Sequence, residues 1–296
     1  MTDLGPIKMF LGLIIERDRQ KRLVFGHQRP YIEPLLMKHE LSSCNGHWTP
    51  QPTGQHLRRS DENADLLDQS GHENYQSIVG SLMWLMNGTR PDLAYTLSLL
   101  SRFSSAPTSQ HLKAAGHTLR YLRNTADLAI QYGSTSSAPA PSPVGFTDSD
   151  FAGDIDDRKS TSGYLFMLAG GAITWRSRKQ PLVAFSTVEA EYIGASDAAK
   201  EAIWMRSFFA QLTNRSLDSL GPQKIFVDYQ GAIQLARKSE FHKRTKHIGV
   251  RYHFVQDACE RNLLHTRYLP TAEMTADILT KILPKEVHWK HVYGLG

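Results

Sequence analysis

The sequence predicts an α/β protein in two parts: a mostly helical first half that opens with a β-hairpin, and a second half in which strands and helices build a mixed sheet. Three observations support this division. Apolar residues recur at helical spacing through much of residues 30–123. Residues 134–143 are rich in Ser and Pro and contain no apolar period. Beyond them, short strand-like runs come first and then alternate with helical segments, the order typical of a mixed α/β domain.

The first half is expected to begin with a hairpin and to continue as helices. Apolar runs at residues 9–15 and 22–26 flank a charged turn. The polar residues 51–73 are expected to form a long loop, and Gly88-Thr89-Arg90-Pro91 is a turn signal between two helices. Helices of this half are expected at residues 30–41, 75–86, 92–103 and 111–123.

The Ser/Pro segment is expected to be a linker between two domains, because prolines stiffen it and no apolar face survives in it. The predicted organisation is a first domain at 1–133, a linker at 134–143 and a second domain at 144–296. Strands of the second domain are expected at residues 144–147, 163–168, 172–175, 224–227 and 266–269. Its helices are expected at residues 188–212, 230–237, 245–261 and 272–281.

Composition sets broad limits on function. With 296 residues and 41% hydrophobic side chains, the chain is long enough for two packed domains. The net charge of +5 is a mild basic bias that is compatible with a polyanionic partner. Cys44 and Cys259 fall in different halves, so neither a disulfide framework nor a Cys-based zinc site is expected. No signal peptide or membrane-spanning apolar run is present, and an intracellular chain without a membrane partner is expected.

Acidic residues at the edges of apolar segments in the second half carry the strongest functional signal. The four acids are Asp148, Glu191, Asp228 and Asp277. Two of them end predicted strands and two open predicted helices. Because ligands of open α/β sheets bind beyond the strand ends, these side chains are expected to converge there.

Four converging carboxylates with no His or Cys among them form an all-oxygen site. Such a site suits Mg²⁺, with Mn²⁺ as the alternative, rather than zinc. Two such ions held side by side support hydrolysis of a phosphodiester. Taken singly, each acid could instead cap a helix or lie solvated on the surface.

A second candidate surface is basic. Lys243, His247 and Arg251 recur at a four-residue step, with Lys246 beside them, along the predicted helix 245–261. This stripe could follow the phosphate backbone of a nucleic acid, or it could be an ordinary solvated helix face. Both interpretations stay open from the sequence.

Several neighbouring residues are expected to have supporting roles. Asp150, two positions beyond the first acid of the site, could lie behind the metal ligands because alternate strand residues share a face. Glu189 is expected to cap its helix. Trp84, Trp175 and Trp204 occupy apolar periods and are expected in the core.

Eight short strings, in family order across nearly the whole chain, resemble the C-terminal part of a copia-type retrotransposon Pol polyprotein. The strings are Phe10-Leu11-Gly12, Gly80-Ser81-Leu82-Met83, Thr89-Arg90-Pro91-Asp92, Arg120-Tyr121-Leu122-Arg123, Ser160-Thr161-Ser162-Gly163-Tyr164, Glu189-Ala190-Glu191-Tyr192, Thr245-Lys246-His247-Ile248 and Ala276-Asp277-Ile278-Leu279-Thr280-Lys281. The first half resembles the end of a reverse transcriptase, from the last part of the palm through the thumb and connection. The second half resembles a ribonuclease H domain.

The resemblance implies an RNase H-like mixed five-stranded sheet with flanking helices. It makes Asp148, Glu191, Asp228 and Asp277 catalytic ligands of two Mg²⁺ ions, and it implies cleavage of RNA in RNA–DNA hybrids. The alternatives are a catalytically inactive remnant that binds nucleic acid and an inert transposon relic. One departure bears on activity: Tyr229 stands where the family usually has a small polar residue.

The resemblance also implies what this chain should not do. The family's polymerase site contains a Tyr-x-Asp-Asp element and an earlier Asp, and this sequence contains neither before its Phe-Leu-Gly string. No polymerase activity is therefore expected from this chain alone. The missing fingers and palm are expected as partners in a longer polyprotein, and the family implies a location in a cytoplasmic particle or the nucleus.

Overall fold

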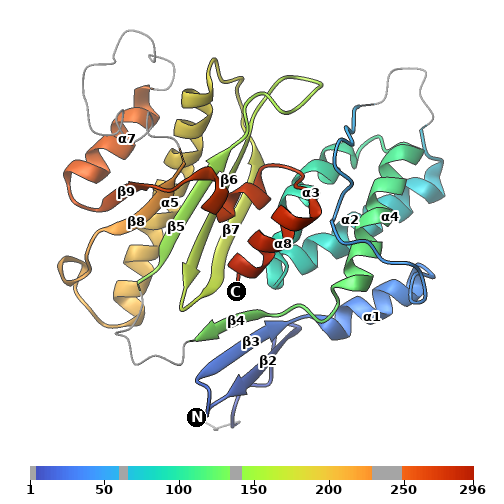
Figure 1. Ribbon diagram of the computed structural model, residues 1–296, viewed down its shortest axis with the longest axis horizontal. Helices are drawn as coiled ribbons and strands as arrows, with labels where there is room; N and C mark the ends of the chain where they lie inside the picture. Colours follow the sequence, from blue (N-terminus) through green and yellow to red (C-terminus); the bar gives the residue numbers. More distant parts are fainter. Residues whose placement is uncertain (1–4, 60–65, 134–141, 229–248) are drawn as a thin grey trace. The chain divides into compact units, whose positions relative to one another are not determined.

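The computed structural model describes residues 5–59, 66–133, 142–228 and 249–296, and Figure 1 shows its ribbon. The chain divides into two compact units. The first unit comprises Met1–Pro139, Ala169–Ala172 and Ile282–Gly296, and the second comprises Ala140–Leu168 and Ile173–Lys281. Within the described residues, no helix combines the length and the apolar character that a membrane crossing requires.

The first unit opens with the predicted hairpin and builds a four-stranded antiparallel sheet from it. In sheet order, its strands are β1 (Met9–Phe10), β2 (Leu13–Asp18), β3 (Leu23–His27) and β4 (Ile130–Gly133). The predicted run 9–15 is broken in the middle, because Leu11 and Gly12 adopt positive φ angles of 48° and 77°. The strand β4 was not predicted from the sequence.

The first unit also contains α-helices. They are α1 (Arg29–Lys38), α2 (Gln69–Gly88), α3 (Ala94–Leu100), α4 (Ser109–Asn124) and α8 (Lys285–Gly294). The predicted loop 51–73 is wrong in its last five residues, because Asp68 caps α2 by accepting a hydrogen bond from Gly71 N at 2.8 Å. The predicted helix 92–103 is instead a short α-helix between two 3₁₀ turns, Pro91–Leu93 and Ser101–Phe103.

The C-terminal helix α8 was not predicted, and it belongs to the first unit although the sequence placed residues 144–296 in one domain. His288 Nε2 lies 3.0 Å from the Tyr121 hydroxyl, and Trp289 Nε1 donates to Trp48 O at 2.9 Å. The buried residues of this helix are His288, His291 and Val292. Because two of the three are histidines, the sequence shows only a weak apolar period there. The assignment of the two domains to polymerase and nuclease parts stays a prediction.

The second unit is built on the predicted mixed sheet of five strands. In sheet order these are β7 (Gly171–Lys179), β6 (Thr161–Leu168), β5 (Val144–Ser149), β8 (Gln223–Val227) and β9 (Leu264–Tyr268). The strand β5 pairs antiparallel with β6 and parallel with β8, which is in turn parallel to β9. The carboxyl ends of β5 and β8 therefore meet at one edge of the sheet.

Among the described residues of this unit, the helices α5 (Thr187–Leu212) and α7 (Gly249–Glu260) cover the sheet, and α5 packs against β5, β6 and α7 (Figure 1). Gly194 lets α5 approach closely, because a Cβ there would collide with Ser149 Oγ. The predicted helix 272–281 is wrong as an α-helix: its residues form two 3₁₀ turns, Thr271–Glu273 and Thr275–Leu279. The predicted helix 230–237 lies outside the described residues.

Candidate metal centre

Three of the four predicted acids meet at the edge of the sheet. Asp148 is on β5, Asp228 directly follows β8, and Asp277 is on the 3₁₀ turn Thr275–Leu279. One carboxylate oxygen from each of these residues lies within 4.8 Å of the others. Parallel pairing of β5 and β8 explains why two acids so distant in the sequence end side by side.

The 3₁₀ turn carrying Asp277 can approach β6 closely because that strand has a glycine, Gly163, at the point of contact. A Cβ on Gly163 would lie 2.6 Å from the Leu279 side chain, so only glycine allows the turn to approach this closely. Thr280, at the end of the turn, donates a hydrogen bond to Asp148 Oδ2. The string 276–281 thus supplies both an acid and a hydroxyl that orients another acid.

Glu191 lies beside this group of three aspartates. Its Oε1 accepts a hydrogen bond from Ser149 N at 3.3 Å, which holds it next to Asp148. The sequence had indicated that Glu191 lies in the first turn of its helix. Because α5 begins at Thr187, Glu191 instead lies in the second turn.

Burial and mutual repulsion make the ionised forms of these acids unfavourable. Burial, with the nearby charges of Asp148 and Asp228, raises the pKa of Glu191 to about 10. Burial and Asp148 likewise raise the pKa of Asp277 to about 7, and they raise that of Asp228.

Among the described residues, Lys281 opposes this accumulation of negative charge. Lys281 Nζ lies 3.1 Å from Asp277 Oδ2 and 3.5 Å from Asp148 Oδ2. Burial alone would lower the pKa of Lys281, but these two carboxylates raise it above its ordinary value. The lysine was not selected from the sequence, although it ends the string 276–281.

The residues present fit a divalent cation. Asp277 Oδ1 is buried and accepts no hydrogen bond from any described residue, which is an expensive state for a carboxylate oxygen unless a cation contacts it. The donor set contains carboxylates alone, as hard cations such as Mg²⁺ prefer.

Two acids that neighbour this site in the sequence, Glu189 and Asp150, form hydrogen bonds to the backbone. Glu189 caps α5 as predicted: its Oε2 accepts from Phe185 N at 2.9 Å, and its own N–H donates to Ser186 Oγ at 3.2 Å. Asp150 Oδ1 accepts a hydrogen bond from Thr161 N and is not in the group of three aspartates.

The predicted basic stripe is only partly within the described chain. Lys243, Lys246 and His247 lie outside it, as does Tyr229. Arg251, at the start of α7, has its Nη1 3.6 Å from Asp197 Oδ1 on α5, and it lines a cavity separate from the metal centre.

The tryptophan predictions are wrong in two of three cases. Trp84 is 46% exposed and Trp204 is 58% exposed, whereas Trp175 is half-buried. The buried face of α5 contains alanines together with Tyr192, Ile193 and Met205, whereas Trp204 and Phe208 are exposed.

Comparison with known proteins shows that the chain is similar to transposon polyproteins. The chain is 39% identical over 289 residues to the retrovirus-related Pol polyprotein from transposon TNT 1-94 of Nicotiana tabacum, a match that covers 96% of this chain and 21% of that protein. It is 35% identical over 298 residues to the Pol polyprotein from transposon RE1 of Arabidopsis thaliana, covering 100% of this chain and 19% of that protein. No family model matches.

The homologues of this chain are retrovirus-related Pol polyproteins from copia-type transposons, as the resemblance in the sequence indicated. It spans about a fifth of the length of these two relatives.

Among solved structures, the chain is similar to LC11-RNase H1 in complex with an RNA/DNA hybrid, at 12% identity and a TM-score of 0.36 over 47% of this chain and 94% of that one. The predicted mixed five-stranded sheet with helices packed on it is confirmed.

Proposed function

We propose that the second unit is a ribonuclease H that hydrolyses the RNA strand of RNA–DNA hybrids with the help of divalent metal ions. The convergence of Asp148, Asp228 and Asp277 within 4.8 Å supports this most directly, because they come from three separate elements. The family of the chain adds support, since a retrotransposon Pol polyprotein must remove RNA from its hybrid intermediate.

In this proposal the four acids hold two Mg²⁺ ions, or Mn²⁺ as the alternative. Asp148 lies at the middle of the cluster, where its charge raises the pKa of the other three acids. The bound ions would supply Lewis-acid stabilisation for negative charge on the scissile phosphate. The ligands themselves are Asp148, Glu191, Asp228 and Asp277.

Other side chains keep the acids in place. Thr280 donates to Asp148, and Thr271 Oγ1 donates to Asp228 Oδ2 at 3.0 Å. Each hydrogen bond occupies one carboxylate oxygen and so fixes the direction of the other. Burial and the neighbouring carboxylates favour the protonated form of Glu191 by raising its pKa, and a bound cation would favour the ionised form.

The hybrid substrate is the proposed nucleic-acid partner. The chain would recognise the RNA strand by its 2′-hydroxyls. Lys243, Lys246, His247 and Arg251 remain the predicted phosphate contacts. The first unit is proposed to be the tail of the reverse transcriptase, whose fingers and palm would be partners in a longer polyprotein.

Cleavage of a labelled RNA–DNA hybrid by the purified chain, with Mg²⁺ or Mn²⁺ and beside Asp148→Asn, tests the proposal. We expect metal-dependent cutting of the RNA strand alone, with a loss of more than about 100-fold in the variant. Hybrid binding without any cutting by the folded protein would instead support the catalytically inactive remnant.

A further inference from the structure

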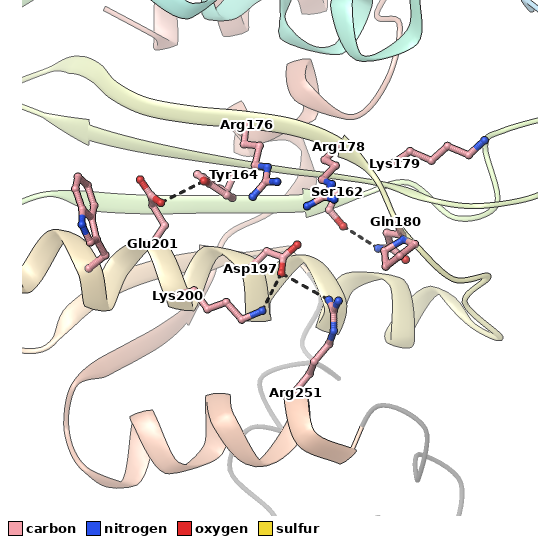
Figure 2. Close-up of a pocket in the computed structure, with 12 residues that line it drawn as sticks. Ser162, Tyr164, Arg176, Arg178, Lys179, Gln180, Asp197, Lys200, Glu201 and Arg251 are labelled. Carbon is pink, nitrogen blue, oxygen red and sulfur yellow. Dashed lines mark hydrogen bonds and ion pairs between the residues drawn. The ribbon is translucent and has the colours of Figure 1, made fainter. Parts of the chain in front are cut away.

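The second unit contains a cavity of about 500 Å³ that shares no residue with the metal centre. It lies between α5 and the strands β6 and β7, with Arg251 of α7 at its rim (Figure 2). Its inner end is made by Ser162 and Gln180, which are linked by a 2.7 Å hydrogen bond.

Two arginines on the strand β7 point toward this cavity. Thr174 Oγ1 donates to Glu201 Oε1 on α5 at 2.9 Å, which identifies the face of β7 that looks onto the helix. Because alternate residues of a strand share a face, Arg176 and Arg178 lie on that same side, about 7 Å apart. Both are exposed, and Arg178 has no hydrogen-bond or ion-pair partner within the part of the chain that the structure describes.

The remaining charges leave the cavity positive. Lys200 Nζ and Arg251 Nη1 share one carboxylate, Asp197, at 3.4 and 3.6 Å. The other carboxylate is Glu201, which accepts hydrogen bonds from Thr174 and from the Tyr164 hydroxyl. Lining cations thus outnumber lining acids even without Lys179.

Lys179 is not counted among these cations because it forms ion pairs with two aspartates outside the cavity. Its Nζ lies 2.6 Å from Asp154 Oδ2 and 2.8 Å from Asp157 Oδ1, and neither aspartate lines the cavity. A ligand in the cavity would therefore meet Arg176 and Arg178 as its main unneutralised cations.

An aromatic surface borders the same cavity. Trp204 lines it and is 58% exposed. Its ring stacks on Phe208, one turn further along α5, with centroids 5.5 Å apart and planes inclined by 13°. Such a flat exposed ring beside guanidinium groups offers a stacking surface and phosphate donors together.

We propose that this cavity binds a single strand of nucleic acid, with phosphates on Arg176 and Arg178 and a base stacked on Trp204. Guanidinium groups bind phosphate oxygens through paired N–H donors, and exposed aromatic rings stack on unpaired bases of any sequence. A base within a duplex has both faces covered, so a strand with free bases fits this arrangement better. The proposal does not depend on hydrolysis at the metal centre.

Binding of a fluorescein-labelled oligothymidylate to the full chain in EDTA tests this proposal separately from cleavage. We expect binding to quench tryptophan fluorescence, and this quenching should be largely lost in Trp204→Ala. Arg176→Ala/Arg178→Ala should weaken binding at least about tenfold, and it should reduce the salt slope by about 1.4, the value for two lost single-strand phosphate contacts. Trp204→Ala should weaken binding by about tenfold while leaving the salt slope unchanged.

The matched control is Lys21→Ala/Arg261→Ala, which removes the same charge from two exposed side chains that form ion pairs away from the cavity. Equal losses in this control and in the arginine variant would overturn the proposal, as would a wild-type chain that does not bind the oligonucleotide. Competition by polyglutamate as effective as by unlabelled oligothymidylate at equal charge would also overturn it, in favour of an acidic protein partner. Thermal midpoints would confirm that the variants are folded.

Discussion

Each unit buries a cluster of ionisable groups, and the two clusters are built on opposite principles. In the first unit, Arg90 and Asp92 are 1% and 4% exposed and pair at 2.7 Å. In the second, three aspartates converge and a partly exposed lysine is the one cation within ion-pair distance of them among the described residues. The carboxylate of the first cluster is paired with an arginine, whereas the second cluster holds more carboxylates than cations among the described residues.

The carboxylates of Asp92 and Asp277 differ in how many of their oxygens accept hydrogen bonds. Both oxygens of Asp92 are used: Oδ1 accepts from Arg90 Nε at 3.0 Å, and Oδ2 accepts from Arg90 Nη2 and from the Tyr121 hydroxyl, both at 2.7 Å. Burial alone would raise the pKa of Asp92, but these partners hold it below its ordinary value. Asp277 instead keeps a buried oxygen without a described partner. In the proposed function this oxygen would contact a metal ion, whereas the fully partnered Asp92 is expected to stabilise the fold.

The largest expected effect is on the first cluster. Asp92→Asn should lower the free energy of unfolding by about 3–5 kcal/mol, because it leaves the Arg90 charge buried without its counter-ion. Urea denaturation followed by circular dichroism would measure this loss. Asp127→Asn, which breaks an exposed ion pair with Arg29 in the same unit, is the control and should cost less than about 1 kcal/mol. Equal losses of unfolding free energy in the two variants would show that the buried pair of Asp92 is no more important for stability than an exposed ion pair.

The equivalent change in the second cluster should affect activity and leave stability intact. Asp277→Asn removes one of several mutually repelling charges, so the metal-free protein should be at least as stable as wild type. Cleavage of the RNA–DNA hybrid should fall by more than about 100-fold, since a proposed metal ligand is lost. Thermal unfolding in EDTA and in Mg²⁺ would test both parts. A variant destabilised in EDTA would show that Asp277 stabilises the fold and is not poised for a ligand.

The acids of the second cluster could be predicted from the sequence because each follows or begins an apolar segment, a local pattern. The first cluster could not, because Tyr121 and His288 are separated by 167 positions and meet through a C-terminal helix with a weak apolar period. The exposure of Trp204 was missed for a related reason: α5 is apolar on two faces, and periodicity does not tell which one the sheet covers. Alanines and Tyr192 of α5 are buried in the core with the sheet, whereas Trp204 and Phe208 are exposed.

The two units should respond to pH in opposite directions in the absence of metal. The pKa of Asp277 is raised to about 7, so its protonated form stabilises the second unit, and this stability is lost as pH rises from about 4 through 7. Burial lowers the pKa of His288 to about 4, so the first unit is stable above pH 6.5 and loses stability as pH falls toward 4. The change should be on the order of 2 kcal/mol in each unit. Hydrogen exchange resolved by peptide, in EDTA across this range, would separate the units; a parallel response would contradict the expectation.

The smallest expected effect concerns Lys281, which occupies oxygens that a metal ion would use. Lys281→Met should reduce the Mg²⁺ concentration for half-maximal cleavage by about three- to tenfold, because the lysine no longer competes for Asp148 and Asp277. The metal-free protein should lose about 1 kcal/mol of stability, since the acids then repel one another without a counter-ion. Lys224→Met, on the exposed side of β8, is the control for a changed net charge. If Lys281→Met instead raised the Mg²⁺ requirement, the lysine would assist metal or substrate binding. The contrast between an acid cluster that lacks counter-ions and the fully paired Asp92 would then be smaller.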